Sequence, residues 1–219
     1  MKWTFGLSRA GRGKGVKQVA PESWKDDSVT HIRAGTYTLL GELLSFPPTE
    51  KRLKSLARIN VARADSHMPL APGWEALREA AASTDVDTVA DEFRALFAWG
   101  GRGRIMPFAS WYLTGELMDQ PPADLRFDLM SLGIEPREGS CATEDHAGAL
   151  CDVMGMIVAC PEEFEPASQE KIFRRYLEPW IGRFFADLQE TKPARFYHAV
   201  GEFGQCFIEI EKQYFTLLQ

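Results

Sequence analysis

Three consecutive ionisable residues, Glu144, Asp145 and His146, stand directly before an apolar segment that continues to Val158. Carboxylates near a helix N-terminus interact favourably with its partial positive charge, and an imidazole titrates near neutral pH. Thr143 is the expected N-cap of this helix, with Glu144 and Asp145 in its first turn. The cluster has two interpretations: Asp145 and His146 act as an acid/base pair, or His146 is a capping or packing residue.

An enzyme is disfavoured by what accompanies these residues. No Ser or Cys nucleophile motif and no metal-ligand spacing stands with Asp145 and His146, and adjacent side chains on a helix diverge. The four cysteines include no CxxC pair, so we expect free thiols and no metal site. The GGRGR loop at residues 100–104 lacks the Gly-Lys-Ser/Thr of a phosphate loop. We therefore expect neither catalytic residues nor a cofactor.

A second stretch with binding chemistry is rich in aromatic residues. It comprises Pro107, Phe108, Ser110, Trp111 and Tyr112. Aromatic segments of helical proteins usually pack in the core, and for Trp111 and Tyr112 the sequence leaves both core packing and a binding role open. An apolar groove bordered by acidic groups would form if this stretch met residues 144–146 in the fold.

Helical periodicity runs through most of the chain. Apolar residues recur at helical spacing over residues 29–45, 86–97, 168–188 and 193–214, and shorter helices are expected around residues 49–56, 74–77 and 121–132. Pro179 should kink the helix expected at residues 168–188, and Gly133 should end the short helix expected at residues 121–132. No alternating strand run or Asn-Gly hairpin occurs. The sequence predicts an all-α fold, a single globular domain of about eight to ten helices with no significant sheet.

The charge is distributed unevenly along the 219 residues. Residues 1–20 carry five basic and no acidic side chains, whereas the rest of the chain carries 20 basic and 31 acidic ones. We expect residues 1–27 to form a flexible basic tail and residues 28–219 to form the helical domain. An acidic body disfavours binding to nucleic acid and suits a basic partner.

The expected location follows from what the sequence lacks. No apolar run approaches the roughly 18 residues of a membrane span, and the N-terminus has no apolar core typical of a secretory signal. We therefore expect a cytoplasmic protein without stable membrane insertion.

The order of several motifs resembles the TorD/DmsD/NarJ family. The motifs are MPFASWYL, a helix ending in LGI, EDH before an apolar helix, YLEPW and FYHAVGEF. They follow one another from about Phe93 to the C-terminus. Proteins of this family are cytoplasmic, system-specific chaperones for molybdenum enzymes, many of which are exported by the twin-arginine route. The resemblance implies an all-helical chaperone and no enzymatic activity.

The resemblance also implies site residues. The Pro-aromatic-x-Ser-aromatic segment of the family falls on residues 107–112, and its acid-Asp-His motif falls on residues 144–146. Its His-Leu-x-Pro-Trp segment falls on residues 176–180, where Tyr176 replaces the usual His. A role that needs a titrating group at this position therefore does not carry over. The GGRGR loop and the basic tail have no counterpart that we can place.

A chaperone of this kind recognises a twin-arginine signal peptide, which offers two guanidinium groups followed by an apolar segment. We expect the aromatic stretch, with Leu96 and Phe97, to line a groove for the apolar segment. Glu144 and Asp145 would attract the basic region, and His146 would fix the polar end of the groove. The expected partners are the signal peptide and the apo-form of the catalytic subunit of a molybdenum-cofactor oxidoreductase, with molybdenum cofactor biosynthesis proteins as further candidates.

Two alternatives within the resemblance stay open. In the NarJ-like branch the client is a non-exported molybdoenzyme, and the groove would contact the mature apo-enzyme. Guanine nucleotide binding has also been suggested within the family, which would make the chain a helical switch that responds to GTP, although it has no phosphate loop. The sequence identifies neither the client nor the oligomeric state.

Overall fold

The structure is a computed structural model, and it describes residues 7–9, 27–60, 69–97, 103–117, 123–136, 143–192 and 194–218. Ten α-helices lie within these residues, so the predicted all-α fold is confirmed. The first helix begins at Asp27, one residue before the predicted domain boundary. Most of the expected basic tail and residues 100–102 of the GGRGR loop lie outside the described residues.

The helices are α1 (Asp27–Ser45), α2 (Glu50–Ala57), α3 (Ala71–Ala82), α4 (Val86–Phe97), α5 (Ala109–Thr114), α6 (Ala123–Ser131), α7 (Ala147–Ala159), α8 (Pro166–Ile172), α9 (Glu178–Glu190) and α10 (Phe196–Leu217). A π-helical turn, η2 (Phe173–Leu177), joins α8 to α9. Two strands of three residues, β1 (Leu7–Arg9) and β2 (Ile134–Pro136), pair antiparallel. These two strands form the sheet of the described residues, and the sequence did not predict them.

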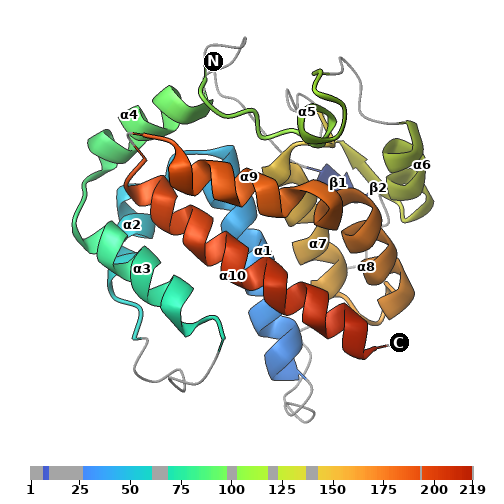
Figure 1. The fold of residues 1–219 in the computed structure, drawn as a ribbon. Coiled ribbons are helices and arrows are strands. Elements are labelled where there is room, and N and C mark those ends of the chain that lie inside the picture. The colour runs from blue at the N-terminus through green and yellow to red at the C-terminus, as the bar shows by residue number, and fades with distance from the viewer. Residues whose placement is uncertain are drawn as a thin grey trace.

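α1 and α7 pack against each other behind α10 in Figure 1, and glycines allow their close approach. A Cβ atom at Gly148 would lie 2.2 Å from the Ser45 hydroxyl oxygen and 3.0 Å from the Gly41 carbonyl oxygen. A Cβ atom at Gly155 would lie 2.8 Å from the hydroxyl oxygen of Thr38. We call this contact the glycine seam, and it fixes α7 on α1 at a distance that larger residues would not allow.

α9 and α10 lie side by side across the front of the molecule in Figure 1. Most of the apolar stripes predicted for these segments is buried, although Ile210 and Tyr214 are only partly so. Large buried side chains of the two helices are Trp180, Phe184, Phe185, Phe196, Phe203, Phe207 and Phe215. Another glycine contact brings the two helices together, because Gly204 of α10 faces the ring of Phe185. The C-terminal third of the chain therefore supplies much of the apolar core.

The effect expected at Pro179 takes the form of the π-helical turn. Proline has no backbone N–H, and its ring clashes with the carbonyl group four residues before it in an α-helix. In η2 the backbone N–H of Glu178 donates to the carbonyl of Phe173, five residues back. The indole N–H of Trp180 donates to the Tyr176 carbonyl at 2.7 Å. The wider turn thus accommodates the proline within a continuous helical segment.

Gly204→Ala is expected to lower the free energy of unfolding by about 1–3 kcal/mol. The added Cβ would lie 2.3 Å from two atoms of the Phe185 ring, a rigid group that cannot swing away. Urea denaturation followed by circular dichroism measures the change.

Gly182→Ala in α9 is the matched control. Its Cβ would lie no closer than 3.8 Å to another side chain, so the gain in helix propensity should raise stability by about 0.5–1 kcal/mol. Similar effects of the two substitutions would contradict the packing argument.

Candidate functional site

The two segments singled out in the sequence meet in the structure. The Ala109 N–H donates to the Asp145 carbonyl at 3.0 Å, and the Ala147 N–H donates to the Pro107 carbonyl at 2.8 Å. This pairing is an isolated antiparallel bridge between extended backbones. It places the start of α5 beside the start of α7. We call residues 107–110 and 143–147 the junction.

Asp145 is buried at the centre of the junction. Its Oδ2 accepts a hydrogen bond from the Ser110 N–H at 3.0 Å, and its Oδ1 accepts one from the Thr143 hydroxyl. The first N–H groups of a helix lack intrahelical partners, so the carboxylate satisfies one of these groups at the start of α5. Both oxygens of Asp145 are therefore engaged within the chain.

His146, and not the predicted Thr143, is the N-cap of α7. Its Nδ1 accepts from the Gly148 N–H at 3.0 Å, and its ring meets the Phe108 ring edge-on at a centroid distance of 5.1 Å. Burial lowers the pKa of His146 to about 4, against the opposing charge of Asp145, so the ring is neutral at neutral pH. The prediction of Thr143 was wrong because α7 begins at Ala147 and not at Glu144: residues 144 and 145 form a turn, and His146 stands at the position from which a side chain reaches the N–H groups of the first turn.

Glu144 is also buried, and it connects the junction to α6 through an ion pair. Arg126 of α6 donates from Nε to Glu144 Oε1 at 2.9 Å. Asp128 of the same helix accepts from the Tyr176 hydroxyl and from Lys171, both at 2.7 Å. Tyr176, which stands where the resembling family usually has His, thus holds α6 against η2.

The other predicted site residues separate into buried and accessible positions. Leu96, Phe97, Pro107 and Ser110 are buried, and Phe108 and Tyr112 are partly buried. The Tyr112 hydroxyl donates to Asp187 of α9 at 2.7 Å. Trp111 differs from the rest because it is exposed. The junction therefore gathers most of the predicted residues, but mainly as a packed connection and not as the walls of an open groove.

Apolar side chains are exposed on the two helices that the junction holds. Trp111 and Leu113 of α5 and Leu117 after it are 42%, 50% and 47% exposed. Phe127 and Met130 of α6 are 72% and 59% exposed. We call the first three residues the α5 surface and the last two the α6 surface. Large exposed apolar residues that gather in one region of a surface are typical of interaction sites.

The sequence did not single out four of these five residues, although α6 carries a signal for them. Leu125 and Leu129 are buried, while Phe127 and Met130 occupy other sides of the same helix. A short helix with apolar residues all round cannot bury every side against one core. From the sequence alone, that pattern could have predicted exposed apolar residues on this helix.

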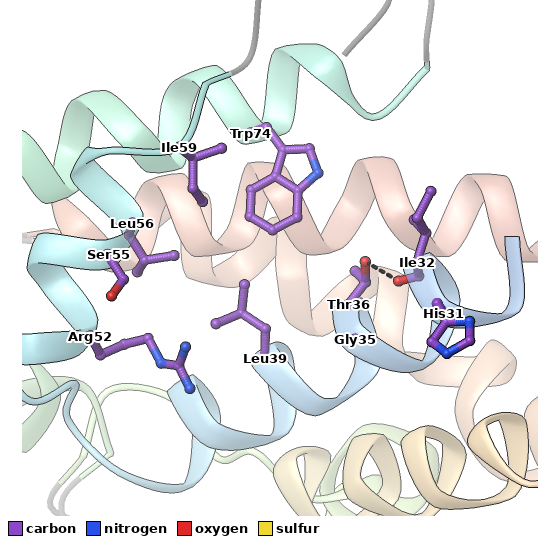
Figure 2. Close-up of a pocket in the computed structure, with 10 residues that line it drawn as sticks. All are labelled: His31, Ile32, Gly35, Thr36, Leu39, Arg52, Ser55, Leu56, Ile59 and Trp74. Carbon is purple, nitrogen blue, oxygen red and sulfur yellow. Dashed lines mark hydrogen bonds between the residues drawn. The ribbon is translucent and has the colours of Figure 1, made fainter. Parts of the chain in front are cut away.

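A pocket of about 410 Å³ lies elsewhere, between α1, α2 and α3. Figure 2 shows Trp74 and Leu39 facing it, with Arg52 and His31 at opposite ends. The complete lining is His31, Ile32, Gly35, Thr36, Leu39, Arg52, Ser55, Leu56, Ile59 and Trp74. Arg52 donates to Glu42 at 2.9 Å. None of the ten predicted site residues lines this pocket, whose residues follow ordinary amphipathic patterns in the sequence.

Within the described residues, no group of three or more His, Cys, Asp or Glu side chains is arranged to hold a metal ion. No described helix combines the length and the apolar character needed to cross a bilayer.

Comparisons with known proteins give two matches. Residues 67–186 match the family model described as nitrate reductase delta subunit, and this range contains the junction, α5 and α6. The chaperone protein TorD of Shewanella loihica is 22% identical over 194 residues, which cover 82% of this chain and 90% of that protein.

The stability of the chain should fall in acid through His146, and His146→Asn should remove this effect. The folded protein keeps the ring neutral down to about pH 4, whereas the unfolded chain takes up a proton near the ordinary pKa of 6.5. The free energy of unfolding of the wild type should therefore fall by about 3 kcal/mol relative to that of the variant as the pH falls from 6.5 to 4. Above pH 6.5 the difference between the two proteins should stay nearly constant.

Asn can cap α7 through its side-chain oxygen without titrating, so it isolates the charge of the imidazole. Urea denaturation at several pH values gives the difference in unfolding free energy. A difference that stays constant from pH 4 to 8 would show that His146 titrates normally.

Proposed function

Because the chain belongs to the nitrate reductase delta subunit family, which includes the TorD-type chaperones, we propose that it is a maturation chaperone for a molybdenum-containing oxidoreductase. The family match covers more than half of the chain, and the family consists of chaperones and not of enzymes. In the proposed role, the chain binds the twin-arginine leader or the apo-form of the catalytic subunit in the cytoplasm. It holds this client until the cofactor is inserted.

The observation that supports this role best is the exposed α5 surface beside the junction. A leader with an apolar segment needs an accessible apolar partner, and Trp111 offers a large, rigid ring for this contact. Tyr112 ties α5 to α9 through Asp187, and Asp145 caps the same helix. The surface is therefore presented on an element whose position is fixed from two sides.

In this proposal the buried acidic residues position the binding surface and do not pair with the client directly. Both oxygens of Asp145 accept hydrogen bonds within the junction, and Glu144 is paired with Arg126. Attraction of a basic leader then comes from the net charge of the whole chain, which is −6. Such long-range attraction affects mainly the rate of association and weakens with salt.

A second candidate is a NarJ-like assembly factor for an enzyme that is not exported. The observation that favours it is the matching family model, whose description names a nitrate reductase subunit. Such a factor would bind the mature part of the apo-enzyme, and the α5 and α6 surfaces suit a folded client as well as a peptide.

Trp111→Ala should weaken binding of a synthetic leader peptide, with two consecutive arginines and a following apolar segment, by about tenfold. Its unfolding free energy should change by less than about 0.5 kcal/mol, because the side chain is exposed. Fluorescence anisotropy of the labelled peptide measures the affinity.

Leu217→Ala is the control, because Leu217 is an exposed apolar residue at the far end of α10. Its affinity for the peptide should equal that of wild type. If Trp111→Ala also bound like wild type, the α5 surface would have no part in leader recognition.

The two candidate functions differ in their dependence on the leader. We expect the apo-form of the client subunit to bind at least about tenfold more weakly once its leader is removed. Its capture by the tagged chain, with and without the leader, gives the comparison. Equal capture of both forms would favour the NarJ-like function over leader recognition.

A further inference from the structure

The N-terminal segment of the chain supplies a strand to the helical domain. Leu7–Arg9 form β1 and pair antiparallel with β2, in the register Leu7↔Pro136, Ser8↔Glu135 and Arg9↔Ile134. β1 also contacts α7, and Figure 1 shows it beside β2 near that helix. The edge of β2 therefore accepts an extended backbone, which is the geometry by which folded domains bind peptides through added strands.

The position of β2 connects this edge to the proposed client-binding region. β2 follows α6 directly, after Gly133 in a left-handed conformation with φ of 69°, and buried Ile134 anchors it in the core. The junction begins seven residues after Pro136. An extended peptide on β2 would thus lie next to α6, which contacts β2.

The pairing of β1 with β2 is short enough to be exchanged. Two paired strands of three residues are marginal by themselves. Seventeen residues separate Arg9 from the start of α1 at Asp27, and a chain of this length can reach up to about 60 Å. β1 can therefore leave β2 without any movement of the helices.

The charge of the N-terminal segment matches that of a leader. The first 20 residues carry five basic and no acidic side chains, whereas the rest of the chain has an excess of acidic residues. Glu135, the central residue of β2, is exposed. β1 itself contributes one of these basic residues, Arg9, so the strand paired with β2 belongs to a basic stretch of the sequence, as the leader of the proposed client does.

We propose that the edge of β2 is an acceptor site for an extended basic segment of the client leader, and that β1 occupies it as an internal competitor. This inference depends on the proposed function, because the client leader supplies the competing strand. Backbone hydrogen bonds to β2 would hold the basic segment, while the apolar segment contacts the α5 surface. Release of β1 is then the step that makes the acceptor site available.

A double substitution, Leu7→Pro with Ser8→Pro, tests the competition while it keeps the length and charge of the chain. Consecutive N–H groups of a strand point in opposite directions, so the two prolines remove at least one donor that faces β2, either that of Ser8 or that of Leu7. If β1 occupies the edge in about four of five molecules, the variant should bind the synthetic leader peptide about fivefold more tightly. Leu7→Ala with Ser8→Ala is the matched control and should bind like wild type.

Hydrogen exchange of the Ile134 and Glu135 amides reports on the edge itself. Exchange should be faster in the proline variant than in the alanine control, and bound leader peptide should slow it again. Equal affinities of the two variants, or a bound leader that leaves exchange at these amides unchanged, would overturn the proposal and leave β1 as a structural strand.

Failure of the proposed function gives a different result. In that case the leader peptide binds neither variant, and a peptide of residues 1–17 can be added to the proline variant instead. Slower exchange at Ile134 or Glu135 would then support the acceptor edge without a leader function. Unchanged exchange would overturn the acceptor edge as well.

Discussion

The buried carboxylate of Asp145 connects segments 35 residues apart, and the positions of three helices depend on it. It fixes the start of α5, while its neighbours Glu144 and His146 bind α6 and begin α7. Three consecutive residues thus set the relative placement of elements that have little apolar contact with one another. Buried polar groups of this kind are stable only when every hydrogen-bonding atom has a partner, which makes the arrangement specific.

Much of the architecture was predictable from the sequence, because helical periodicity and caps are local signals. A short helix, α2, forms where one was expected around residues 49–56, Gly133 takes the left-handed conformation after α6 that ends this helix, and residues 86–97 form α4. The meeting of the two motif segments was also predictable, but only through the family resemblance. The hydrogen-bonding and ion-pair partners of Asp145 and Glu144 were not predictable, because they come from other elements. β1 was missed since three residues are too few for an alternating pattern.

The chain combines a closely packed core with elements that are only partly buried. The core consists mainly of α1, α7, α9 and α10, whereas α5 and α6 bury some apolar residues against it, expose others, and are also held by hydrogen bonds and ion pairs. Both exposed apolar surfaces belong to this second group. The junction and α9 hold α5 in place, so a partner could bind its exposed side chains without any change in the core.

The glycine seam between α1 and α7 has a consequence for how such chaperones can diversify. Since no side chain can be inserted there without forcing the helices apart, Gly148 and Gly155 leave this interface almost no room for variation. Changes that alter which polypeptide is recognised therefore have to arise outside this interface. Exchange of the segment from α5 to β2 between relatives, with the two packed helices left intact, is the natural way to engineer a chaperone for a different oxidoreductase.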